Sequence, residues 1–124
     1  MRIQAALIFL LYLVRVSAQT TPVIDSLQLL IENEKDEEKL ILLYNTIAGE
    51  YKSIDPYVTR DYADKAYTLA SERKDLKGQS DALHKKGVSY YYLDSYDTAL
   101  AYYHQSYDLA KAAGDSLLDR KSVV

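Results

Sequence analysis

The 124-residue sequence has no cysteine and no tryptophan, and it has only two histidines and four glycines. The lack of cysteine excludes disulfide bonds, thiol catalysis and thiolate-bound zinc or iron–sulfur centres. His84 and His104 lie twenty residues apart, and no Gly-x-Ser-x-Gly turn is present. The four separated glycines form no phosphate-binding loop. We therefore expect a protein that is not an enzyme, with no catalytic residue, no cofactor and no metal ligand.

A basic excess is also missing, since fifteen Lys and Arg stand against eighteen Asp and Glu, for a formal net charge of -3. Neutralising phosphates requires a positive surplus, so the charge argues against a nucleic-acid partner. The hydrophobic content of 48% is enough for one small globular domain.

The first eighteen residues are typical of a secretory signal peptide. Arg2 precedes an apolar run over residues 5–14, and Val16-Ser17-Ala18 places small residues before a cleavage point. A membrane-spanning helix needs about 20 apolar residues, so export is favoured over an uncleaved anchor, which stays the alternative. We expect an exported, periplasmic or secreted protein with no stable membrane span after cleavage. Cleavage removes two arginines and no acid, which changes the net charge from -3 to -5.

The rest of the chain has helical periodicity almost throughout. Thr21 followed by Pro22 is typical of a helix N-cap and first turn, and apolar residues then recur at three- and four-residue spacing. Asp55-Pro56 and Gly114-Asp115 indicate breaks. The predicted helices cover residues 22–31, 40–55, 57–74, 76–93 and 96–113, with a sixth over 116–124. The predicted fold class is all-α.

The chain also contains an internal repeat. An offset of 39 pairs Tyr51 with Tyr90, and an offset of 40 then pairs Tyr62 with Tyr102 and Ala70 with Ala110. We therefore expect a leading helix and linker over residues 19–38, two helical hairpins over 39–77 and 78–114, and the start of a truncated third copy over 115–124.

These positions resemble the tetratricopeptide repeat family, in which small residues and aromatics recur on the two helices of each hairpin. The matching residues are Tyr44, Ile47, Ala48 and Tyr51 in the first copy and Gly87, Tyr90, Ala99 and Tyr103 in the second. The chain departs from the family pattern at Lys86, Ser106, Thr59 and Ala63. The period near 40 and the two breaks are similar to the extracytoplasmic N-terminal repeats of Bacteroidota-type sensor and regulator proteins. The resemblance implies antiparallel hairpins stacked as a right-handed solenoid.

Two residue types have a physical role in such a stack. Small residues let helix axes approach to the usual 8–10 Å, and they are Ala48, Ala66, Ala70, Gly87, Ala99 and Ala110. Twelve tyrosines follow the predicted signal peptide, and we expect most of them to fill gaps between helices.

The resemblance further implies a concave face lined by the first helix of each hairpin. The candidate groove residues are Asn45, Lys52, His84, Lys85, Tyr91 and Tyr92, together with Thr46, Gly49, Ser53 and Val88. The carboxylate clamp known in the family is incomplete here. The alternative for Tyr91 and Tyr92 is packing against the helix of a following repeat.

The resemblance implies an exported interaction module with a protein or peptide ligand, either a scaffold or the sensory N-terminal part of a larger protein. The alternative is a structural fragment of a sensor histidine kinase or transcriptional regulator whose activity lies beyond residue 124. An open third repeat would also favour self-association.

Overall fold

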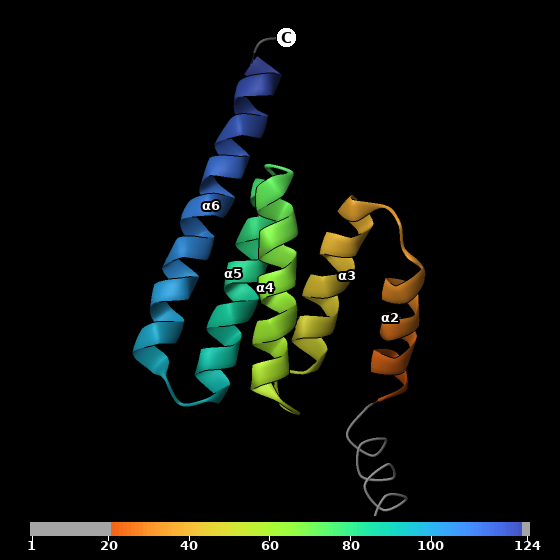
Figure 1. Cartoon of the computed structure of the whole chain (residues 1–124). Helices are drawn as coiled ribbons and strands as arrows, with labels where there is room; N and C mark the ends of the chain where they lie inside the picture. The colour runs from red at the N-terminus through yellow and green to blue at the C-terminus, as the bar shows by residue number, and fades with distance from the viewer. Residues whose placement is uncertain (1–20, 123–124) are drawn as a thin grey trace, which may run out of the picture.

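The computed structural model describes residues 21–122, with side chains for residues 21–114, and this part of the chain is helical with no strand. The predicted signal peptide lies outside the described residues. Five helices follow one another: α2 (Pro22–Asn33), α3 (Glu37–Glu50), α4 (Pro56–Glu72), α5 (Leu76–Tyr92) and α6 (Tyr96–Ser122) (Figure 1). The predicted all-α class is confirmed.

Side-chain caps determine where the first four helices begin. The Thr21 hydroxyl accepts a hydrogen bond from the Ile24 amide at 3.2 Å, and aspartates cap the next three helices in the same way. Each such cap contributes about 1 kcal/mol. Proline follows the cap directly in α2 and α4, where the missing amide hydrogen is not needed.

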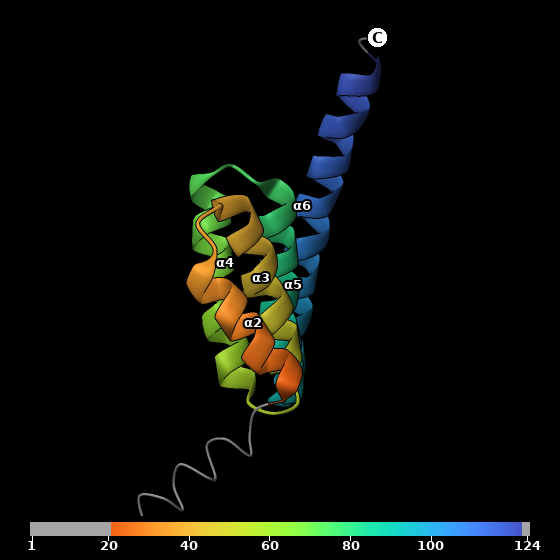
Figure 2. The same ribbon diagram turned by 90° about the vertical axis from the view of Figure 1, so that its right-hand side faces the viewer.

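The break expected at Gly114-Asp115 is wrong, because α6 continues without interruption to Ser122. A lone glycine in a helix costs about 1 kcal/mol relative to alanine, which is not enough to end a helix whose flanking residues are helix formers. The predicted sixth helix is therefore the end of α6, and this end extends past the neighbouring helices (Figure 2).

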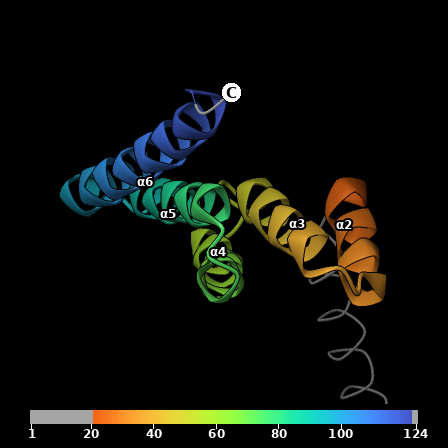
Figure 3. The same cartoon turned by 90° about the horizontal axis from the view of Figure 1, so that it is seen from above.

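Consecutive helices run antiparallel, and each packs against the next (Figure 1). In addition, α3 packs against α5, and α4 lies to one side of that pair when the molecule is seen from above (Figure 3). The two hairpins α3–α4 and α5–α6 overlap the two predicted copies of the internal repeat, although α5 begins two residues before the second copy and α6 continues past its end.

The core contains one apolar cluster and a series of buried small residues at the contacts between helices. Ile24, Leu27, Ile47 and Tyr51 form the cluster between α2 and α3. Five of the six predicted small residues are buried as expected. Ala110 is the exception, since it is exposed and no helix of the described chain covers this side of α6.

Polar side chains bridge the helices of each hairpin. The buried Thr59 hydroxyl donates to the Ala48 carbonyl at 2.8 Å in the first hairpin. In the second, Ser80 and Ser106 each donate to the other's carbonyl, at 2.7 and 2.8 Å. These bonds give the side chains of Thr59 and Ser106 a structural role at the helix contacts.

The expectation that most tyrosines fill gaps between helices is wrong for half of them. Tyr51 is buried and five others are half-buried, whereas six are exposed to solvent: Tyr57, Tyr67, Tyr91, Tyr92, Tyr96 and Tyr107. Three of these six lie together at the α5–α6 turn. The rings of these three tyrosines therefore lie together on the surface and do not fill a gap between helices.

Candidate functional site

A hollow of about 230 Å³ lies between α3 and α5. Its lining residues are Leu42, Asn45, Thr46, Asp81, His84 and Lys85. They are three pairs of equivalent positions in the two repeats, each pair separated by 39 residues. The hollow therefore exists because the second hairpin is stacked beside the first in the same register.

Sequence reasoning found four of the six lining residues and missed Leu42 and Asp81. Each of the two lies about one helical turn before a residue that was found, and the same offset of 39 relates them to each other. Extending the candidate residues by one helical turn in both copies, at the repeat offset of 39, would have identified Leu42 and Asp81 from the sequence.

Asn45 has an unusual position in this hollow. Its side chain is 6% exposed, and its amide nitrogen donates to the Gly78 carbonyl at 3.3 Å. Its side-chain oxygen is buried and accepts no hydrogen bond. Leaving a buried polar atom unpaired costs about 1–3 kcal/mol. A ligand N–H group would recover that free energy if the Asn45 side chain turned its oxygen toward the hollow on binding.

The other wall of the hollow is charged. Partial burial, reinforced by the positive charge of Lys85, lowers the pKa of His84, and Asp81 opposes this shift. The His84 ring also lies 5.2 Å from the Tyr103 ring, measured between centroids. His84 is therefore mostly neutral at pH 7, and Lys85 supplies the positive charge of this wall.

A substituent on Gly49 would approach the Lys85 side chain. A β-carbon built at Gly49 would lie 3.3 Å from the Lys85 Nζ atom. The absence of a side chain at position 49 thus leaves room for the lysine to lie across α3. Lys85 is half-buried as a result.

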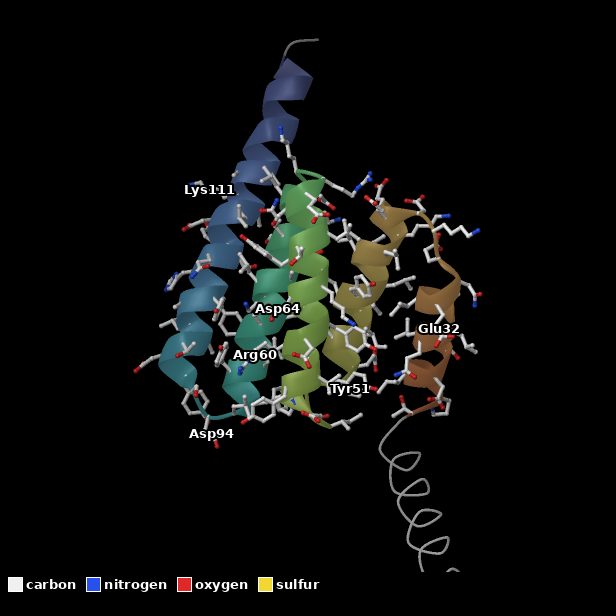
Figure 4. All side chains as sticks on the ribbon, in the orientation of Figure 1. Glu32, Tyr51, Arg60, Asp64, Asp94 and Lys111 are labelled. Atoms are coloured by element: carbon white, nitrogen blue, oxygen red, sulfur yellow. The ribbon has the colours of Figure 1, made fainter. Side chains whose placement is uncertain are left out.

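The remaining predicted groove residues do not line the hollow. Lys52 is exposed in the α3–α4 turn, and Tyr91 and Tyr92 are 53% and 43% exposed at the end of α5. Both places lie at the same end of the molecule, where Figure 4 labels Tyr51 at the end of α3 and Asp94 in the α5–α6 turn. The predicted groove is therefore divided into a hollow and a separate aromatic surface.

The described residues contain no cluster of three or more His, Asp or Glu side chains able to hold a metal ion. In residues 21–122, no helix combines the length and apolar character needed to cross a membrane. Comparison with known protein families, curated proteins and solved structures finds no match.

Proposed function

We propose that this chain is an exported protein-interaction module of the tetratricopeptide-repeat type, and that the hollow between α3 and α5 binds a peptide segment of its partner. Two equivalent antiparallel hairpins and the contact between their first helices support the repeat assignment. In such stacks the first helices line the concave binding surface.

The observation that carries this proposal is the unpaired oxygen of Asn45. Asn45 lines a hollow whose opposite wall carries the positive charge of Lys85, with Asp81 nearby, and its unpaired oxygen is buried beneath the surface of this hollow. An extended peptide can offer a backbone N–H to Asn45 and an acidic side chain to Lys85.

The size of the hollow distinguishes a peptide from a larger ligand. Pockets for cofactors and drug-sized molecules typically measure about 300–1,000 Å³. A volume of about 230 Å³ is smaller than this range and suits one or two side chains of a chain that continues across the surface.

The test uses peptides selected from a random library on the mature chain. Asn45→Leu has a similar shape and removes the unpaired oxygen, so we expect at least about tenfold weaker peptide binding. The stability should change little, because the gain from removing this oxygen is opposed by the loss of the hydrogen bond to the Gly78 carbonyl. Lys85→Gln should also weaken binding. Lys65→Gln, on the other side of α4, is the matched control. Equal affinity of Asn45→Leu and the parent would contradict the proposal.

The alternative function is a structural segment of a larger signalling protein. The exposed tyrosines and the uncovered side of α6 favour it, because a following helix could pack there. In that case no selected peptide would compete at the hollow, and a longer gene product with a kinase core or helix-turn-helix domain would carry the activity.

Export is tested separately. Protein made in a secreting host should begin at Gln19, as determined by N-terminal sequencing. A membrane-bound product that still begins at Met1 would assign the chain to the anchored class.

A further inference from the structure

Three exposed tyrosines form a corner at the α5–α6 turn. The Tyr91 ring meets Tyr92 at 75° and Tyr96 at 61°, with ring centroids 5.8 and 5.4 Å apart. Asp94 lies in the turn between them, and its Oδ1 atom accepts a hydrogen bond from the Tyr96 hydroxyl at 3.1 Å. We refer to Tyr91, Tyr92, Tyr96 and Asp94 as the tyrosine corner.

Four tyrosines elsewhere in the described chain have a cation over the ring face. The Arg60 guanidinium lies 4.0 Å from the Tyr90 centroid, and the Lys86 ammonium lies 5.1 Å from the Tyr102 centroid. Tyr57 and Tyr62 have similar contacts with Arg60 and Lys65. Within residues 21–114, no such contact involves a ring of the tyrosine corner.

The sequence explains why the corner has no cation of its own. Residues 87–110 contain seven tyrosines and three aspartates but no lysine or arginine. The stretch is therefore acidic and rich in aromatic faces. Both features attract a positive charge, the carboxylates by Coulomb attraction and the rings through their quadrupoles.

We propose that the tyrosine corner binds a lysine or arginine side chain presented by a basic segment of a partner protein. The exposed rings supply faces for the cation, and Asp94 supplies the opposite charge. Asp94 is fixed in place by the turn, where its backbone has φ 61°, and by its hydrogen bond to Tyr96.

This inference goes beyond the peptide-binding hollow and depends on different residues. Tyr91 follows His84 by seven residues, which corresponds to about 10 Å along the helix. A partner could use both surfaces, but either surface can bind without the other.

The test is an NMR titration of the whole mature chain with a short peptide of alternating glycine and lysine. We expect amide shifts centred on residues 91–97, and much smaller shifts with the same peptide after acetylation of its lysines. Each exposed cation–π contact corresponds to about a two- to fivefold change in affinity. Tyr91→Leu combined with Tyr96→Leu should therefore weaken binding at least about fourfold.

Asp94→Asn removes the charge and should weaken binding as well, without backbone strain, because asparagine also adopts positive φ readily. Tyr107→Leu is the matched control, since Tyr107 is 66% exposed on α6 outside the corner. Its affinity should equal that of the parent.

Four results would overturn the proposal. The first is equal binding of the acetylated peptide, which would indicate a general apolar surface. The second is unchanged affinity of the double tyrosine variant. The third is a set of shifts centred on residues 81–85, which would place the peptide in the hollow instead. A neutral oligosaccharide that shifts residues 91–97 more strongly than the lysine peptide would also contradict it.

Discussion

Gly87 lies where α5 and α6 are in close contact, and replacing it tests the packing of the second hairpin. A β-carbon at this position would lie 2.7 Å from two ring carbons of Tyr103 and 3.2 Å from the Ala99 carbonyl oxygen. Carbon atoms pack best at about 3.5–4.0 Å, so the ring must move by roughly 1 Å. The ring is not free to do so easily, because it also contacts His84.

Two opposing effects set the magnitude for Gly87→Ala. Helix propensity favours alanine by about 1 kcal/mol, whereas overpacking costs about 1–3 kcal/mol. We expect the free energy of unfolding to fall by about 0–2 kcal/mol relative to the parent. Gly87→Leu adds a longer side chain at the same place and should destabilise the fold further.

Gly114→Ala is the matched control for this experiment. A β-carbon there would meet nothing within 4 Å, so only the propensity gain applies. The two alanine variants should differ by about 1–3 kcal/mol in urea unfolding followed by circular dichroism, and about 4–8 °C in melting temperature for each kcal/mol. If both variants gain the same stability, the close approach of α5 and α6 at Gly87 is wrong.

Two further predictions concern single side chains. Thr59→Val should lower the free energy of unfolding by about 0.5–1.5 kcal/mol in urea, because it keeps the shape of a fully buried residue but removes its bond to the Ala48 carbonyl; an unchanged midpoint would contradict this. His84 should titrate below 6.5 by NMR, and Lys85→Gln should move its pKa upward. Because the unfolded chain takes up this proton before the folded chain as the pH falls, the free energy of unfolding should decrease as the pH falls below 6.5, the ordinary pKa of histidine.

The order and type of the helices could be predicted because local signals agree with the packing. Thr21-Pro22 combines a side-chain cap with a proline that suits the first turn, and it starts a helix as predicted. Asp55-Pro56 was predicted only as a break, and in the structure it is also the cap and first turn of α4. The repeat offset located both hairpins, because equivalent small residues had to recur at equivalent crossings.

Two errors concern the end of α6. Ala110 was interpreted from its counterpart Ala70 in the first copy, where α5 packs on α4, and Gly114 was interpreted as a helix-ending glycine. The described part of α6 has no helix on that side, so Ala110 is exposed and α6 continues past Gly114. Equivalent positions in the two copies are therefore equally buried only where the helix that covers the first position has a counterpart that covers the second.

The two hairpins also differ in the polar bonds that join their helices. The first hairpin is bridged near its turn, by Thr59 and Ala48, whereas the second has Ala99 and Gly87 at the equivalent positions. With no hydroxyl at position 99 to bridge the helices there, the glycine lets the Tyr103 ring lie directly against the backbone of α5.

The converse holds at the other end of the hairpins. Ser80 and Ser106 bridge the second hairpin far from its turn, and their equivalents Ile41 and Ala66 are buried apolar residues. Each hairpin thus has one hydrogen-bonded crossing and one apolar crossing, in opposite positions. A serine pair and an isoleucine–alanine pair share no sequence pattern, although they occupy equivalent positions in two similar hairpins. The type of contact at these positions therefore could not be predicted from the sequence.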